Sequence, residues 1–162
     1  MELTTVEILI RLVIAVVLGG LLGLERTLAG KTAGMRTYSM VSLGSALFVG
    51  LAQVVLEMTP ADGVSPLILA SSVITGIGFI GAGLVFHNDH QMKISGLTTA
   101  AGLWVAAGVG IASGFGLYEI ATAATILAVI IFTIMWFIEK GLKKISYADS
   151  PEEKENANHL HD

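Results

Sequence analysis

Residues 22–37 read LGLERTLAGKTAGMRT, and this charged, glycine-containing stretch separates two strongly apolar segments at about 8–24 and 37–57. Glu25, Arg26 and Arg36 are therefore flanked on both sides by sequence suited to hydrocarbon. An ionisable group near the lipid core costs free energy and is by default a candidate for function. The pattern predicts two membrane-spanning helices joined by a short connection, with these three charges as the residues to explain.

The composition places the whole chain among membrane proteins. Of its 162 residues, 54% are hydrophobic and 14% are charged, and the mean hydropathy is +0.78, which argues against a soluble globular protein. A helix needs about 20 apolar residues to cross the bilayer. We therefore expect an all-α membrane protein with about five transmembrane helices, at about 8–24, 37–57, 66–87, 97–114 and 117–138. The Gly114-Phe115-Gly116 sequence predicts a tight turn between the last two.

The basic residues of the chain predict its orientation. They fall in the first and third connections and after the last span, at Arg26, Lys31, Arg36, Lys93, Lys140, Lys143 and Lys144. Cytoplasmic loops are enriched in such residues, so we expect the N-terminus outside and the C-terminus in the cytoplasm. The start lacks the basic region of a signal peptide, which predicts a retained first span. We expect a transmembrane domain at 1–138 and a polar, disordered cytoplasmic tail at 139–162, whose His159 and His161 form no metal site.

Two further charges have structural interpretations. Arg11 lies four residues after Glu7, so the two side chains can pair on one helix face. We expect the Arg11 side chain to extend toward the outer headgroups. Glu119 opens the last span, where a carboxylate favours the positive end of the helix. The absence of cysteine excludes disulfides, thiolate metal sites and a cysteine nucleophile.

Small residues gather on one face of the third span. This arc holds Ser71, Ser72, Thr75, Gly76, Gly78, Ala82 and Gly83. Small side chains and hydroxyls let helices approach closely in lipid, so we expect the arc to face protein. The alternative is a helix break whose carbonyls line a transport path.

The first and fourth spans also carry small residues at helical spacing. Gly19 and Gly23 have GxxxG spacing in the first. In the fourth, Leu97, Trp104 and Ile111 share a ridge that lies opposite Gly102, Ala106 and Gly110. Ser95 is a candidate cap for the fourth helix, whose positive end is a candidate site for an anion or for the Glu25 carboxylate.

The charges of residues 22–37 have two interpretations. A short turn would bring Glu25 and Arg36 together as a local ion pair. Alternatively, Arg26 and Lys31 mark the membrane interface according to the positive-inside rule. The second interpretation does not explain why an acid stands at position 25.

Three groups of motifs, taken together, resemble a known family. They are Gly23-Leu-Glu-Arg26 with Ala33-Gly-Met-Arg-Thr37, then Thr75-Gly-Ile-Gly-Phe-Ile-Gly-Ala-Gly83, then Gly96-Leu-Thr-Thr-Ala-Ala101 with Leu103-Trp104. In this order and spacing, over about residues 8–121, they resemble the MgtC/SapB family of bacterial inner-membrane proteins. The resemblance implies a multi-pass plasma-membrane protein linked to low-magnesium adaptation and, in pathogens, to virulence. It also implies a regulator that binds larger membrane proteins, notably ATP synthase.

The resemblance carries a candidate functional core onto this chain. The core comprises Glu25, Arg26, Gly34, Arg36, Thr37, Thr75, Gly76, Gly78, Gly81, Gly83, Thr98 and Thr99. The chain departs from the family in two respects. Longer members end in a soluble domain where this chain has a polar tail after Glu139, and many members carry an arginine where this chain has Ile68 or an apolar neighbour.

Three functions are compatible with these observations. The first is a regulator that forms a homo-oligomer in the bilayer and docks on ATP synthase or a cation transporter. The second is a transporter or channel for Mg²⁺, another small cation or protons. Magnesium sites use carboxylate and other oxygen ligands, and Glu25 is the one plausible acid near membrane depth, so no dedicated metal site is expected.

The third function, an intramembrane serine hydrolase, is disfavoured. Ser45 follows Gly44, but the four histidines, His87, His90, His159 and His161, fall in a loop or the tail. A solvated turn accounts for His87, Asp89 and His90 as well as a surface metal would. We therefore expect no catalytic residue, no cofactor and no nucleic-acid partner.

Overall fold

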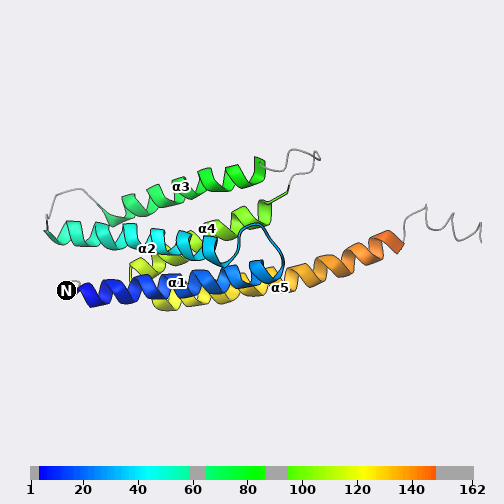
Figure 1. Cartoon of the computed structure of the whole chain (residues 1–162), viewed down its shortest axis with the longest axis horizontal. Coiled ribbons are helices and arrows are strands. Elements are labelled where there is room, and N and C mark those ends of the chain that lie inside the picture. The colour runs from blue at the N-terminus through cyan, green and yellow to red at the C-terminus, as the bar shows by residue number, and fades with distance from the viewer. Residues whose placement is uncertain (1–3, 59–64, 87–94, 149–162) are drawn as a thin grey trace, which may run out of the picture. The chain divides into compact units, whose positions relative to one another are not determined.

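The computed structural model describes residues 4–58, 65–86 and 95–148 and, within them, is entirely helical (Figure 1). The five helices are α1 (Thr5–Leu28), α2 (Met35–Met58), α3 (Pro66–Phe86), α4 (Leu97–Gly114) and α5 (Tyr118–Ala148). Each contains a segment long and apolar enough to cross a membrane. The predicted all-α membrane fold with five spans is therefore confirmed, whereas the orientation of the termini remains a prediction.

Glycines with positive φ mark the helix junctions. Gly30 (φ 65°) follows the end of α1, where the N–H groups of Ala29, Gly30 and Lys31 donate to carbonyls of the last helical turn. Gly116 (φ 78°) does the same between α4 and α5, and this confirms the turn predicted there. L residues with a Cβ rarely adopt this conformation, so these glycines fix where α1 and α4 end.

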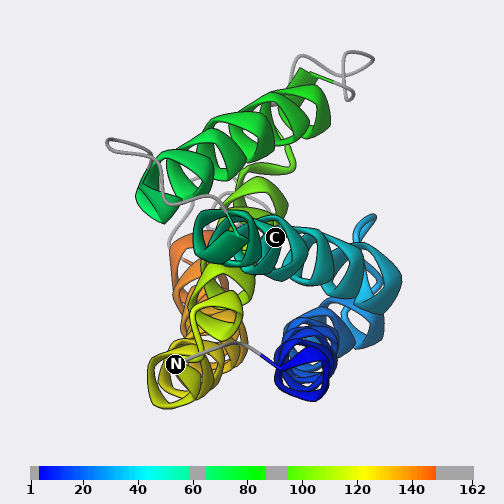
Figure 2. The same cartoon turned by 90° about the vertical axis from the view of Figure 1, so that its left-hand side faces the viewer.

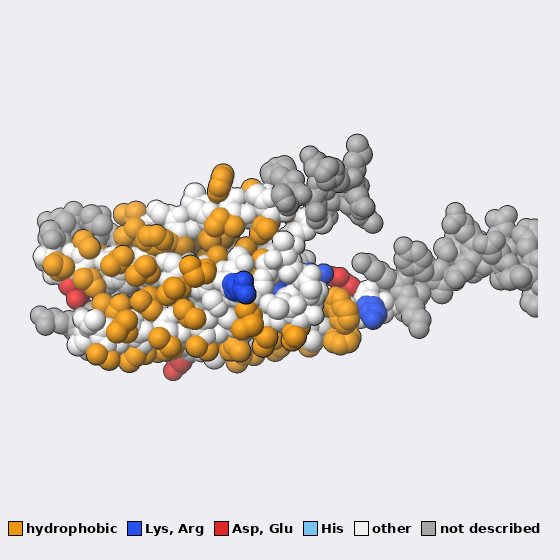
Figure 3. All heavy atoms as spheres, viewed as in Figure 1, with side chains coloured by type: hydrophobic (Ala, Val, Ile, Leu, Met, Phe, Trp, Pro, Cys, Tyr) orange, Lys and Arg blue, Asp and Glu red, His pale blue; other side chains and the backbone are white. Residues whose placement is uncertain are grey.

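The chain divides into two compact units, residues 1–129 and residues 130–162. In the first unit α2 packs against α1, α3 and α4, and α4 also packs against α1 and α3. Figure 2 shows α2 lying between α1 and α3. Most of the face of these helices seen in Figure 3 carries hydrophobic side chains. Such a surface fits a lipid environment.

The second unit contains the final part of α5. The ring of Phe137 meets that of Trp136 edge-on, with 4.9 Å between centroids, and the Lys140 Nζ atom lies 5.1 Å from the Trp136 ring centre. Aromatic rings beside a lysine are typical of a membrane interface. The α5 helix continues past the predicted end of its span to Ala148. Residues 149–162, with His159 and His161, lie outside the described residues, so the disordered tail remains a prediction.

Two glycines of α1 lie where this helix comes closest to α2 and to the residue before it. A Cβ built on Gly19 would lie 2.7 Å from Ser42 Cβ, and one on Gly23 would lie 2.6 Å from Met35 Cα. Such distances leave no room for a methyl group. The GxxxG pair of the first span therefore allows close backbone approach, the usual basis of helix association in lipid.

The α4 helix also contacts α2 closely through small residues. Gly102, Ala106 and Gly110 are buried, while Leu97 and Trp104 on the opposite ridge are 60% and 55% exposed. A Cβ on Gly114 would lie 2.9 Å from the Ala46 carbonyl oxygen. The small-residue side of the fourth span is therefore its inner face, and Gly114 extends it by one turn.

Within the single chain, the predicted small-residue face of α3 does not pack against the other helices, so its contact with protein remains a prediction. Its protein-facing side carries the buried Ala70 and Ile77, and a Cβ on Gly81 would lie 3.5 Å from Ala100 Cβ. The predicted face is exposed at all its members, Ser71, Ser72, Thr75, Gly76, Gly78, Ala82 and Gly83. Its hydroxyls need no interhelical partner because they donate to carbonyls of α3 itself. The helix is also continuous, which contradicts the alternative of a break.

Candidate functional site

The connection between α1 and α2 brings several candidate residues to one end of the first unit. Thr27, in the last turn of α1, donates its hydroxyl to the Gly23 carbonyl and accepts the Met35 N–H, both at 3.0 Å. A Cβ on Gly34 would overlap the Thr27 hydroxyl. The candidate Gly34 therefore allows the connection to lie close to α1. Thr27 holds the connection there through its hydrogen bonds. Sequence reasoning missed Thr27.

A buried ion pair lies beside this connection. The Arg26 Nε donates to Glu25 Oε2, and the Arg26 side chain is only 4% exposed. A buried guanidinium without an anion would be strongly destabilising. The buried Arg26 cation therefore explains why an acid stands at position 25. Arg26 forms a buried ion pair and does not only mark the membrane interface.

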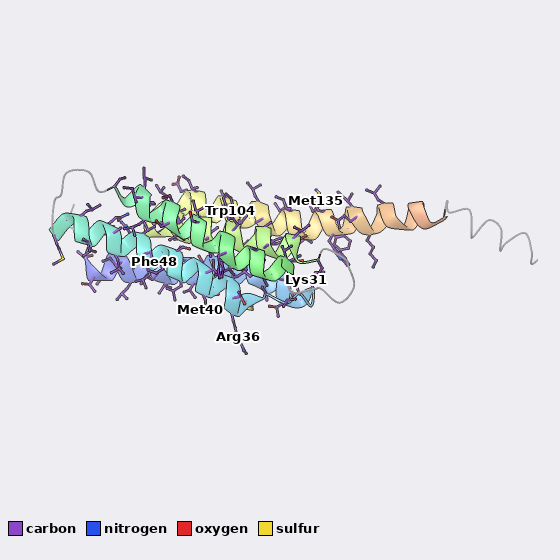
Figure 4. All side chains as sticks on the ribbon, turned by 90° about the horizontal axis from the view of Figure 1, so that it is seen from above. Lys31, Arg36, Met40, Phe48, Trp104 and Met135 are labelled. Atoms are coloured by element: carbon purple, nitrogen blue, oxygen red, sulfur yellow. The ribbon has the colours of Figure 1, made fainter. Side chains whose placement is uncertain are left out.

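The expected pair between Glu25 and Arg36 does not form. Arg36 is exposed, and Figure 4 shows its side chain extending away from the helices. The reason is local, because the neighbouring Arg26 occupies the Glu25 carboxylate. Arg36 forms no ion pair with any residue that the structure describes.

Tyr38 links this end of the unit to α4. Its side chain is fully buried and its hydroxyl donates to the Thr99 carbonyl at 3.4 Å. This bond joins α2 to Thr99 of α4, and sequence reasoning missed Tyr38 although it directly follows the Ala33–Thr37 motif.

The remaining candidates lie on other surfaces. Thr37 and Gly76 line a mainly apolar groove of about 630 Å³ between α2 and α3. Thr75, Gly78 and Gly83 are exposed on α3, and Thr98 is exposed on α4. The candidate core therefore contains a polar group near the connection and a small-residue group along α3, whereas Arg36, Thr37 and Thr98 belong to neither.

Ser45, the serine considered as a nucleophile, also lines this groove. Its hydroxyl donates to the Val41 carbonyl at 2.8 Å. The histidines at 87, 90, 159 and 161 lie outside the described residues. Within the described ranges, no group of three or more His, Cys, Asp or Glu residues could hold a metal ion.

A second polar cluster lies at the other end of α1, around Arg11. The guanidinium pairs with Glu7 at 2.9 Å, as predicted. It also donates to Gln53 Oε1 and to the Gly114 carbonyl, each at 2.8 Å. Arg11 is 9% exposed, so the expectation that it extends to the headgroups is wrong. The C-terminal carbonyl of α4 attracts the cation inward, and the cluster joins α1, α2 and α4.

Comparison with known proteins decides the family. The sequence profile described as MgtC family matches residues 12–140. The chain belongs to the MgtC family. Together with the five apolar helices, this membership makes it a multi-pass protein of the bacterial inner membrane.

Individual MgtC-family relatives support this assignment. A protein of Escherichia coli named "Putative magnesium transporter YhiD" is 37% identical over 135 residues, which cover 80% of this chain and 61% of the relative. Protein SrpB of Synechococcus elongatus is 40% identical over 102 residues, which cover 56% of this chain and 54% of the relative. Protein MgtC of Brucella abortus is 40% identical over 87 residues, which cover 54% of this chain and 34% of the relative. The chain therefore spans about three fifths or less of these relatives. No solved structure matches it.

Proposed function

We propose that this MgtC-family protein regulates ion or energy homeostasis during low-magnesium adaptation by docking on a larger membrane protein. The observation that carries the proposal is the exposed small-residue face of α3. Within the chain α3 packs through its other side, so this face remains available to a helix from outside. Small residues on a lipid-exposed face allow close approach of a partner helix.

The groove beside this face extends the proposed contact. It holds about 630 Å³ between α2 and α3, and its lining includes Met40, Phe48 and Ile80. A volume of this size accommodates several side chains of a partner helix. The family resemblance suggests ATP synthase or a cation transporter as the partner.

Crosslinking in cells tests this proposal. A photoreactive residue replaces Thr75 on the exposed face, and a control carries it at Val13, which is 61% exposed on α1. In cells grown without magnesium, we expect a crosslink to ATP synthase or a cation transporter from position 75 and none from position 13. Equal crosslinking from both positions, or none to these proteins, would refute the docking face. A crosslink to a second copy would instead favour the predicted homo-oligomer as the occupant.

A transport function is the second candidate, and the name of the Escherichia coli relative favours it. The Glu25 carboxylate is the group to test, because it is the acid of the polar group near the connection. Purified protein in liposomes should show Mg²⁺ or proton flux that Glu25→Gln abolishes if the protein is a transporter. The regulator proposal expects no flux from either form.

A further inference from the structure

The groove between α2 and α3 runs along a ridge of α2 that begins with Arg36. Met40, Gly44 and Phe48 line the groove at intervals of four residues, and residues four apart lie on the same face of a helix. Arg36 stands four residues before Met40, so it extends this ridge by one turn beyond the groove. Figure 4 shows Arg36, Met40 and Phe48 following one another along α2. The apolar groove therefore has a positive charge at one end.

The lining of the groove suits a hydrocarbon chain. The described side chains that line it carry no charge. Its two serines, Ser45 and Ser72, donate their hydroxyls to carbonyls of their own helices at 2.8 and 3.0 Å, so they need no further partner. Met40 and Phe48 are 67% and 54% exposed, and both helices are apolar enough to cross a membrane. The groove therefore opens toward the surrounding lipid.

Arg36 supplies the polar end of this surface. It lies in the first turn of α2, at the end of the span. Its side chain is exposed, and Glu25, the acid expected to pair with it, pairs with Arg26. A guanidinium matches the geometry of phosphate oxygens, and basic residues at a membrane surface attract anionic headgroups. Arg36 is therefore available to an anionic headgroup.

We propose that the groove and Arg36 together bind an anionic phospholipid, with one acyl chain between α2 and α3 and the phosphate at the Arg36 guanidinium. The groove volume of about 630 Å³ lies within the range of about 300–1,000 Å³ that is usual for small-molecule sites. The acyl chain itself gains little, because it exchanges one hydrocarbon environment for another. The charge of Arg36 therefore provides the preference for an anionic over a zwitterionic lipid. The lipid occupies the groove when no partner helix does, so this site does not rest on the docking proposed above.

Photolabelling of the full chain tests the headgroup preference. The protein is placed in phosphatidylcholine nanodiscs with a small fraction of phosphatidylglycerol that carries a diazirine in its acyl chain, and labelled peptides are identified by mass spectrometry. This probe should label the groove residues about fivefold more than a phosphatidylcholine probe with the same acyl chain does. Arg36→Gln should remove this preference. Lys31→Gln removes the same charge from an exposed residue outside the groove lining, and its preference should stay within about twofold of wild type.

A second pair of variants tests the groove itself. Gly44→Leu places a side chain in the groove without displacing a helix, because a Cβ on Gly44 meets nothing within 4 Å. Gly108→Leu is the matched control, since Gly108 is exposed on α4 outside the groove lining and a Cβ there also meets nothing within 4 Å. We expect Gly44→Leu to reduce groove labelling by both probes severalfold and Gly108→Leu to leave it unchanged. Thermal unfolding confirms that each variant is folded.

Three results would overturn the lipid site. They are equal labelling of the wild-type groove by the two probes, an equal loss of preference in Lys31→Gln and Arg36→Gln, and wild-type labelling in Gly44→Leu. A second copy of the chain is the other candidate occupant. Crosslinks between two copies from a photoreactive residue at Met40, together with weak lipid labelling of the groove, would overturn the proposal in favour of that occupant.

Discussion

Replacing Gly23 by alanine should loosen the contact between α1 and α2. The added Cβ would lie 2.6 Å from Met35 Cα and 2.8 Å from the carbonyl carbon and oxygen of Gly34. Carbon atoms prefer a separation of about 3.5–4.0 Å, so the backbones must part by about 1 Å. All three neighbours are backbone atoms, so no side-chain rotation can relieve the overlap.

The magnitude follows from two opposing effects. Alanine favours the helix over glycine by about 1 kcal/mol, whereas overpacking typically costs about 1–3 kcal/mol, and more where the neighbour cannot move. We expect a net loss of about 1–2 kcal/mol in the free energy of unfolding. A reduced midpoint in denaturant-induced unfolding, followed by circular dichroism in detergent, would measure it.

Gly76→Ala is the matched control, because a Cβ there meets nothing within 4 Å. This variant should gain about 0.5–1 kcal/mol from helix propensity alone. Equal midpoints for the two variants, or a more stable Gly23→Ala, would refute the close approach of α1 to α2 at this position.

Two further predictions concern the buried cations. Arg11→Met should lower the free energy of unfolding by about 2–4 kcal/mol, since it leaves the Gly114 carbonyl without its donor; an unchanged melting temperature in detergent would contradict this. Glu25→Gln should cost about 1–2 kcal/mol, because Arg26 stays buried while Glu25 itself is partly exposed. The control Arg36→Gln should change stability by less than about 0.5 kcal/mol, and equal losses in the same melting assay would argue against the Glu25–Arg26 pair.

The sequence predicts the helices well because hydropathy and turn chemistry are local properties. The break at Gly114-Phe115-Gly116 needs one residue with positive φ, and Gly116 supplies it. The spacing of small residues in the first and fourth spans was also visible in the sequence. In both, glycines mark where another backbone comes close.

The face of α3 was not predictable on these grounds. Small residues show that close approach is possible, but they do not say whether the partner is the same chain. The choice of Arg26 over Arg36 as partner of Glu25 likewise depends on side-chain direction. Tyr38 and Thr27 were missed because an aromatic residue or a threonine near an apolar segment is commonplace, and their roles depend on contacts with α4 and with the connection.

The side-chain hydrogen bonds of the first unit distinguish α3 from α1, α2 and α4. Side-chain hydrogen bonds join α1 to α2 through Ser39 and Val16, and α2 to α4 through Tyr38 and Thr99. Among the described residues, the side-chain hydrogen bonds of α3 stay within the helix itself or its first turn. Within the described residues, packing therefore holds α3 against α2 and α4, whereas side-chain hydrogen bonds also join α1, α2 and α4 to one another.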